Sequence, residues 1–190
     1  MDIHQQISQR IRELRMARGY TLEELATRSN VSRSMISMIE RAAANPTAVV
    51  LDKLANGLGV SLASLFNGAT NTQPFNPLLR QAEQPLWQDP ESGYIRRSLT
   101  PQGWASSTQL VEVLFPAQGR ITYDLPQRDH AIQQQIWIID GQLDIQLGEQ
   151  CYQLLQGDSL AIRLDHPIIF SNPSAEPCRY VLAIEDRKTP

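Results

Sequence analysis

The chain has 190 residues, of which 42% are hydrophobic and 19% charged, a composition typical of globular proteins. No apolar run approaches the roughly 20 residues that a membrane-spanning helix needs. Residues 1–6 lack the basic flank and apolar stretch of a signal peptide, so we expect a cytoplasmic protein. The net charge of -3 is unevenly distributed: residues 1–66 carry eight basic and six acidic side chains, whereas the remainder carries nine and fourteen. The more positive N-terminal third is therefore the part expected to face an anionic partner.

Apolar residues recur at helical spacing through the N-terminal third of the chain. Ile7, Ile11 and Leu14 mark one face of a first helix, which Gly19 ends. Thr21, with a glutamate three residues further on, has the pattern of a capping box at the start of a second helix.

A tight turn at residues 29–31 leads into a third helix, which Ser32 caps. Residues 45–47, Asn-Pro-Thr, stop this helix and start a fourth, and a short fifth helix runs from Ser61 to Phe66. The sequence therefore predicts a compact five-helix bundle over residues 1–68.

The pattern changes after Phe66. Residues 67–77 are rich in turn formers and poor in periodic hydrophobic residues, so we assign residues 69–89 to a linker. Short alternating strands follow from about Tyr94, and the clearest are Leu110–Phe115, Arg120–Leu125, Gln135–Ile139, Gln142–Leu147, Ser159–Arg163, Ile168–Ser171 and Arg179–Ile184. This spacing predicts a β-sandwich or jelly roll, and we expect a closed antiparallel β-barrel over residues 90–190. The expected fold class is multidomain α + β.

Several different short motifs follow one another along residues 7–66. They are Arg12-Glu-Leu-Arg15, Leu22-x-x-Leu25-Ala26, Val31-Ser32, Ile36-x-x-Ile39-Glu40-Arg41, Asn45-Pro46-Thr47 and Leu54-Ala55-x-x-Leu58-Gly59-Val60. Together they resemble the XRE-type (Cro/C1-like) helix-turn-helix domain along its full length. The resemblance implies a DNA-binding transcriptional regulator whose helix Ser32–Arg41 enters the major groove of double-stranded DNA.

By this resemblance, four side chains of that helix point toward the bases: Arg33, Ser34, Ser37 and Met38. Arg33 can make a bidentate contact to guanine, worth about 1–3 kcal/mol of base discrimination. Ser34 and Ser37 can bond to base edges or phosphates, and Met38 can pack on a thymine methyl group.

Four further residues are expected at the DNA backbone. Thr21 and Ser32 stand at the two helix starts, where hydroxyls and backbone amides suit phosphate oxygens. Arg41 and Asn45 lie where the chain leaves the groove. Glu40, by contrast, is expected to pair with a first-helix arginine, either Arg12 or Arg15.

One position departs from the family pattern. Ala42-Ala43-Ala44 stands where such domains often have a glycine. We therefore expect the backbone to continue helically past Arg41.

The C-terminal half carries a second set of motifs: Trp137-Ile-Ile-Asp-Gly141-x-Leu, Tyr152-x-Leu-x-x-Gly157-Asp-Ser-Leu and Phe170-x-Asn172-Pro173. Residues 90–187 thereby resemble a cupin domain of the kind fused behind XRE-type helix-turn-helix domains. Cupins commonly dimerise, and XRE-type domains read pseudo-palindromic half-sites, so the resemblance implies a homodimer.

The resemblance to cupins also indicates which positions would bind a metal. A metal-binding cupin supplies three histidines and a glutamate, which suit a divalent transition metal. The matching positions here are Arg128, His130, Gln134 and Ile168, so one of the four ligands is present. We expect no required cofactor and no catalysis, with a weak metal site at His130 and His166 as the alternative.

An interior without metal is suited to holding one small molecule. Arg120 and Arg128 can clamp a carboxylate, because guanidinium offers a planar two-donor fork. The remaining expected effector contacts are polar Tyr123, His130 and Gln134 and apolar Trp137, Ile168 and Phe170. This mixture favours an amino acid or a small organic acid as effector.

The sequence thus predicts a dimeric regulator that binds an operator and a small-molecule effector, with no membrane partner. Two alternatives remain open: a metal-dependent cupin enzyme carrying a DNA-binding domain, and a cupin that serves only for dimerisation. Cys151 and Cys178 are expected to be small buried hydrophobic residues without a disulfide.

Overall fold

The computed structural model describes residues 2–66, 75–104, 106–124 and 131–187. The chain divides into a helical unit, Met1–Pro85 with Pro101–Ala105, and a β unit, Leu86–Thr100 with Ser106–Pro190. No helix among the described residues is long and apolar enough to cross a membrane.

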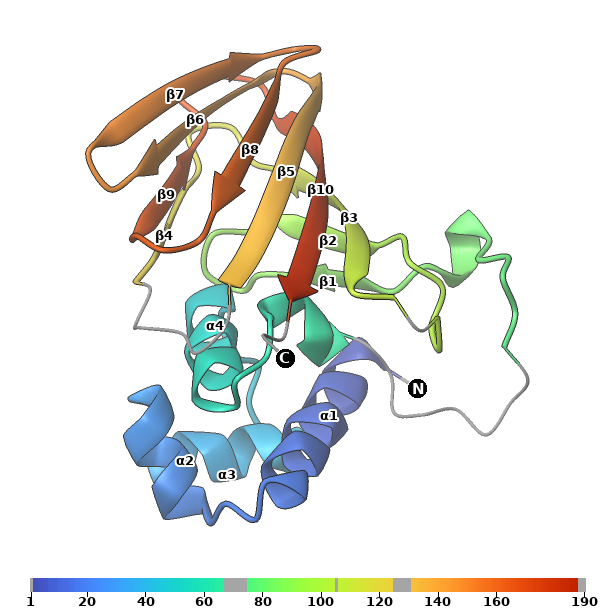
Figure 1. Cartoon of the computed structure of the whole chain (residues 1–190), viewed down its shortest axis with the longest axis vertical. Helices are drawn as coiled ribbons and strands as arrows, with labels where there is room; N and C mark the ends of the chain where they lie inside the picture. Colours follow the sequence, from blue (N-terminus) through green and yellow to red (C-terminus); the bar gives the residue numbers. More distant parts are fainter. Residues whose placement is uncertain (1, 67–74, 105, 125–130, 188–190) are drawn as a thin grey trace. The chain divides into compact units, whose positions relative to one another are not determined.

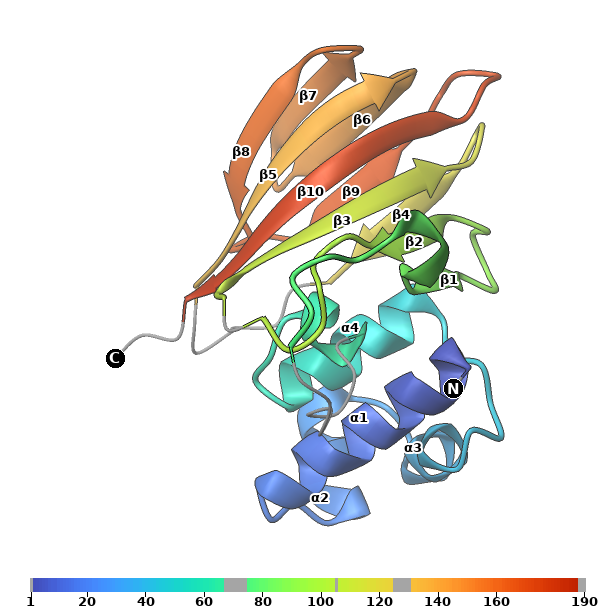
Figure 2. The ribbon, with the colours of Figure 1, turned by 90° about the vertical axis from the view of Figure 1, so that its right-hand side faces the viewer.

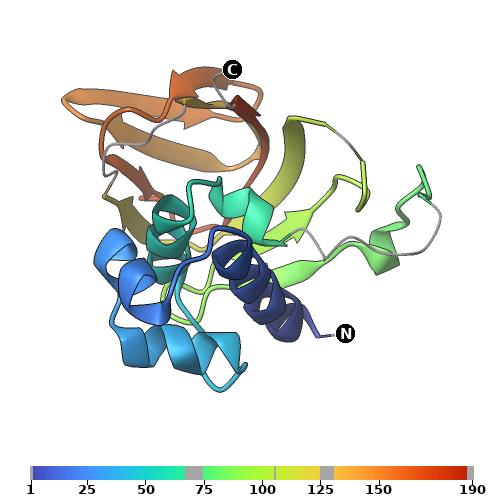
Figure 3. The same cartoon turned by 60° about the horizontal axis from the view of Figure 1, so that its bottom comes forward.

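The helical unit is built from short helices around a small apolar core (Figures 1 and 3). In the described residues they are α1 (Ile3–Ala17), α2 (Leu22–Ser29), α3 (Arg33–Glu40), α4 (Ala48–Gly57) and the 3-10 helices η1 (Leu62–Phe66) and η2 (Gln81–Glu83). The apolar face predicted for the first helix is confirmed, because Ile7, Ile11 and Leu14 are buried.

The prediction of five α-helices is wrong, because the fifth segment, η1, is a 3-10 helix. Its first turn closes between the Ser64 amide and the Ser61 carbonyl, 3.0 Å apart. Hydrogen bonding at this tighter spacing is usual in pieces of only a few residues, which cannot accumulate α-helical bonds.

The end of α3 also differs from the prediction. The amide of Ala43 donates to the carbonyl of Met38, and that of Ala42 to the carbonyl of Ile39, each at 2.9 Å. This is the Schellman pattern, which requires a left-handed residue after the helix, and Ala42 has φ +54°. The expected helical continuation past Arg41 is therefore wrong. The same pattern ends α1 at Gly19, as predicted there.

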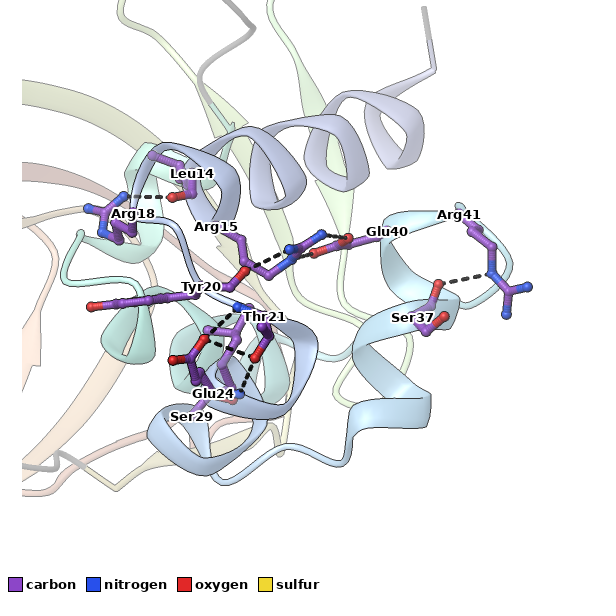
Figure 4. A network of polar contacts seen from close by, with 11 residues as sticks. Leu14, Arg15, Arg18, Tyr20, Thr21, Glu24, Ser29, Ser37, Glu40 and Arg41 are labelled. Atoms are coloured by element: carbon purple, nitrogen blue, oxygen red, sulfur yellow. Dashed lines mark hydrogen bonds and ion pairs between the residues drawn. The ribbon is translucent and has the colours of Figure 1, made fainter.

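Glu40 holds the C-terminal end of α3 against α1 (Figure 4). The Nε of Arg15 donates to one Glu40 carboxylate oxygen at 2.6 Å, and Nη2 donates to the other at 2.8 Å. Nη1 of Arg15 donates to the Tyr20 carbonyl at 2.8 Å. The hydrogen bonds and the negative charge of Glu40 raise the pKa of Arg15 despite its partial burial. The predicted pairing of Glu40 with a first-helix arginine is confirmed, and the partner is Arg15.

The β unit consists of two antiparallel sheets (Figures 1 and 2). The six-stranded sheet has the order β1 (Leu86–Gln88), β2 (Ile95–Ser98), β3 (Thr108–Phe115), β10 (Cys178–Arg187), β5 (Ala131–Asp140) and β8 (Ser159–Arg163). The four-stranded sheet has the order β4 (Arg120–Tyr123), β9 (Ile168–Ser171), β6 (Gln142–Leu147) and β7 (Gln150–Leu155).

Alternation along each strand divides the side chains between the space enclosed by the two sheets and the outside. On the six-stranded sheet, the inner face includes Val111, Val113 and Phe115 of β3, which are buried. Phe170 of β9 stacks on Tyr180 of β10 with ring centroids 6.5 Å apart, so the two inner faces meet across one core.

The prediction of a closed barrel is wrong for the described residues. Among them, β1 and β8 are the edges of one sheet, and β4 and β7 are the edges of the other. Large side chains between stacked sheets keep them about 10 Å apart, which is twice the separation of hydrogen-bonded strands. The result is an open two-sheet sandwich.

All seven predicted strands are present, whereas β1, β2 and β7 were not predicted. The first two are short, and β2 contains the pair Arg96-Arg97, which interrupts apolar alternation. β1 and η2 both lie in the range 69–89 that the sequence assigned to the linker. Cys178 is buried and free as expected, and burial raises its pKa to about 11, but Cys151 is exposed.

Ala42 is the clearest target for a stabilising substitution. Ala42→Gly should raise the free energy of unfolding by about 1 kcal/mol, because only glycine adopts a left-handed conformation without strain. Gly19→Ala is the matched reverse control and should lower it by a similar amount, since no atom lies within 4 Å of the added methyl position. Urea denaturation followed by the helical circular-dichroism signal measures both. A lower stability of Ala42→Gly would contradict this account.

Removing Arg15 should leave a mostly shielded carboxylate at Glu40. Arg15→Ala is expected to cost about 3 kcal/mol of unfolding free energy, whereas Arg12→Ala, at an exposed position of the same helix, should change it by less than about 0.5 kcal/mol. The same denaturation experiment compares the two variants. Equal effects would mean that the ion pair does not hold α3.

Candidate functional site

The α2–α3 pair is set at its angle by the residues of the turn. Asn30 takes the left-handed conformation with φ +53°, and Val31 is buried behind it. The hydroxyl of Ser29 donates to the Leu25 carbonyl at 2.7 Å. A Cβ on Gly57 would lie 2.9 Å from the Ser29 side chain, so glycine at this point of α4 permits the close approach of α2.

Both helices of the pair begin with a side-chain cap. Thr21 Oγ1 accepts from the Glu24 amide at 3.1 Å, and Glu24 accepts from the Thr21 amide at 2.7 Å, which confirms the capping box. The hydrogen bond from the Thr21 amide lowers the pKa of Glu24. Ser32 Oγ accepts from the Met35 amide at 3.3 Å. The hydroxyls of Thr21 and Ser32 therefore serve first to cap the starts of α2 and α3.

The outward surface of α3 presents the side chains that the sequence assigned to base contacts. Arg33 and Ser34 are exposed in the first turn, and Ser37 and Met38 are half-buried in the next. On the opposite surface Ile36 and Ile39 are buried. The four outward residues thus share one helical surface, which an α-helix must present to enter a major groove.

The two residues assigned to the DNA backbone beyond α3 are both exposed. Arg41 follows the last turn, and its Nε donates to the Ser37 carbonyl at 3.1 Å (Figure 4). Asn45 lies in the segment before α4. Arg41 is thereby held along the side of α3 with the rest of its guanidinium pointing outward.

The candidate effector residues divide between the inside and the outside of the β unit. Tyr123, Ile168 and Phe170 lie on the inner face of the four-stranded sheet, where Tyr123 meets Phe170 edge to face with centroids 6.2 Å apart. Gln134 lies on the inner face of the six-stranded sheet, in register with Ile162 and Ile184. Its Oε1 is shielded from solvent and accepts no hydrogen bond from the described residues.

The other candidates do not join this group. Trp137 is 54% exposed on the outer face of the six-stranded sheet, and Arg120 is exposed at the start of β4. Arg128 and His130 lie outside the described residues. His166 is exposed, and its Nδ1 is 2.7 Å from a carboxylate oxygen of Asp165.

The described residues do not fit a metal centre of the cupin type. Two of the four ligand positions carry Gln134 and Ile168, a neutral amide and a side chain without donor atoms. Among the described residues, no group of three histidine, cysteine or acidic side chains is close enough to hold an ion.

Arg96 is a residue of the interior that the sequence did not point to. Only 4% of it is exposed, on the inner face of β2, in register with Trp87 of β1 and Val113 of β3. Val113 is in turn paired with Tyr180. Burial raises the pKa of Tyr180 well above its usual value, and the positive charge of Arg96 offsets a part of this increase. The hydroxyls of Tyr94 and Tyr123 are 3.2 Å apart in the same core. A guanidinium and three phenols therefore make the interior partly polar.

Comparison with known proteins identifies the family. The family model described as helix-turn-helix matches residues 11–65. An uncharacterised HTH-type transcriptional regulator, y4dJ of Sinorhizobium fredii, is 37% identical over 75 residues, which are 40% of this chain and 96% of that protein. The HTH-type transcriptional regulator SutR of Escherichia coli is 25% identical over 87% of this chain and 86% of its own.

The fold is shared over the full length with a solved structure. The crystal structure of an HTH_3 family transcriptional regulator from Vibrio cholerae has a TM-score of 0.77 at 23% identity and covers 98% of both chains. The matched residues 11–65 contain α2, the turn and all of α3. This chain therefore belongs to the XRE-type helix-turn-helix transcriptional regulators, and its helix-turn-helix domain is followed by a two-sheet β unit.

Proposed function

We propose that the chain is a cytoplasmic, homodimeric regulator in which α3 reads an operator and the β unit binds a small effector. The observation that carries the DNA-reading role is the outward surface of α3. Three of its four side chains are polar, and Arg33 and Ser34 are exposed, whereas the helix itself is fixed by Ser32 at its start and by the Arg15–Glu40 pair at its end. Such a helix enters the groove without losing much conformational freedom.

The proposed role of the β unit rests on the polar groups of its interior. The unpartnered Oε1 of Gln134 can accept a hydrogen bond from an ammonium or hydroxyl group of a ligand. Arg96 brings a positive charge into the same core, which favours a ligand with a carboxylate. These two groups support an amino acid or a small organic acid as the effector class, bound without chemical conversion.

The proposed regulation is linkage between two binding events. An effector that binds one arrangement of the two DNA-binding domains more tightly than another changes operator affinity by the same free-energy difference. This difference in effector affinity is sufficient to regulate operator binding.

A second candidate is a β unit that serves only for dimerisation. The contacts of Phe170 with both Tyr123 and Tyr180 favour it, because they fill part of the interior with aromatic rings. Failure of every tested amino acid and small organic acid to stabilise the chain against thermal unfolding would support this alternative.

The DNA-reading proposal predicts that Arg33 and Arg41 differ in what they contribute. Arg33→Ala should weaken binding to an operator selected from a random-sequence library by about 1–3 kcal/mol, with little effect on unrelated DNA. Arg41→Ala should weaken binding to both and lower the slope of log affinity against log salt by about one. Fluorescence anisotropy across a salt series measures both quantities. Unchanged operator affinity of Arg33→Ala would refute the assignment of α3.

The effector proposal predicts a thermal shift. One member of a panel of amino acids and small organic acids should stabilise the chain, by about 2.7 kcal/mol at 100 times its Kd, and the shift should persist with a chelator. Gln134→Leu should abolish the shift, whereas Gln153→Leu, an exposed glutamine of β7, should retain it. Destabilisation by the chelator alone would instead favour the metal-dependent enzyme.

A further inference from the structure

A hollow of about 350 Å³ lies on the outer face of the six-stranded sheet. It crosses β10, β5 and β8, which are adjacent in this sheet (Figure 2). Its lining consists mainly of side chains that alternate with core residues and therefore point outward. These side chains include Ala183, Glu185, Gln133, Gln135, Ala161 and Arg163. Small-molecule sites have volumes of about 300–1,000 Å³, so the hollow is large enough for a small metabolite.

Two rows of outward side chains cross the hollow in the register of the strands. One row contains Gln135 between two alanines, and the next contains Gln133 between Glu185 and Arg163. Because an alanine side chain extends only one carbon atom from the backbone, the first row forms a low floor. The longer side chains of the second row stand beside this floor, so the charged groups are collected along one side of the hollow.

The second row carries opposite charges at its two ends. Glu185 lies on β10 and Arg163 on β8, with β5 between them, so their Cα atoms are about 10 Å apart. Glu185 already has an interaction within the chain, but a carboxylate has about four acceptor positions and can accept a further hydrogen bond. The row therefore offers an anion and a cation to one ligand, with the amide of Gln133 between them.

An α-amino acid matches this spacing. Its nitrogen and its carboxyl carbon are about 2.5 Å apart, and charge-assisted hydrogen bonds of about 2.8 Å extend from each end. The ligand and its hydrogen bonds span roughly 8–9 Å, close to the separation of the two strands. A dicarboxylate would instead place a negative charge beside Glu185, so the row discriminates against it.

We propose that the hollow on the outer face of β10, β5 and β8 binds a zwitterionic α-amino acid, whose carboxylate pairs with Arg163 and whose ammonium group pairs with Glu185. The planar guanidinium of Arg163 suits a carboxylate, because it offers two parallel donors. This site is separate from the effector site proposed inside the sandwich, since the two lie on opposite faces of the same sheet. It does not depend on that proposal.

Calorimetric titration of the full-length chain with each proteinogenic amino acid tests the site. At least one amino acid should bind. Its carboxamide, which lacks the negative charge, and its N-acetyl derivative, which lacks the positive charge, should each bind about tenfold more weakly. R163Q and E185Q should each weaken binding of the amino acid by a similar factor. R12Q removes an exposed arginine of α1 and should leave the affinity unchanged.

The two derivatives assign each charge of the ligand to its partner. R163Q should bind the amino acid and its carboxamide equally, and E185Q should bind the amino acid and its N-acetyl derivative equally. Equal melting temperatures would show that the variants remain folded. Wild-type affinity in both variants would overturn this site.

Two further outcomes separate this site from the proposed function. Loss of binding in Q134L alone would place the amino acid inside the sandwich, which would overturn the outer site and support the proposed effector site. Failure of every amino acid to bind would also overturn the outer site, whereas a small organic acid that stabilises the chain would still support the proposed function.

Discussion

The two hydrogen bonds between the Arg15 guanidinium and the Glu40 carboxylate decide where α3 lies. Helix α3 has only eight residues, too few to be stable alone, so its position comes from its contacts. Ile36 and Ile39 supply the apolar contacts, but apolar packing allows a helix to slide or rotate slightly. A bidentate pair at its last residue removes that freedom, because both donor–acceptor directions must be satisfied together.

The left-handed turn after α3 follows from the same constraint. The chain must leave the helix at once to reach Pro46 and the start of α4, and the Schellman hydrogen bonds of Ala42 and Ala43 achieve this within two residues. An alanine in the left-handed conformation stores strain at this point. The strain is tolerated because the ends of both helices are held by other contacts.

In the β unit, the alternation of side chains along each strand decides which residues face the core and which face outward. Gln134 and Trp137 are three residues apart on β5 and therefore lie on opposite faces, one toward the shared core and one toward the outside. In the proposed regulator, the polar groups of the interior are the ones that an effector would contact.

The sequence by itself determined the helical spacing, the caps at Thr21 and Ser32, seven of the strands and the family of the DNA-binding domain. These are local properties, in which the period of the apolar residues and the nearest few side chains suffice. The tertiary structure decided what depends on distant partners: Arg15 rather than Arg12 as the partner of Glu40, the left-handed backbone at Ala42, the open sandwich in place of a barrel, and the inward position of Arg96. The short strand β2 is held by pairing with β3, and β1 by pairing with β2, and segments of three and four residues are too short to show a periodic signal of their own.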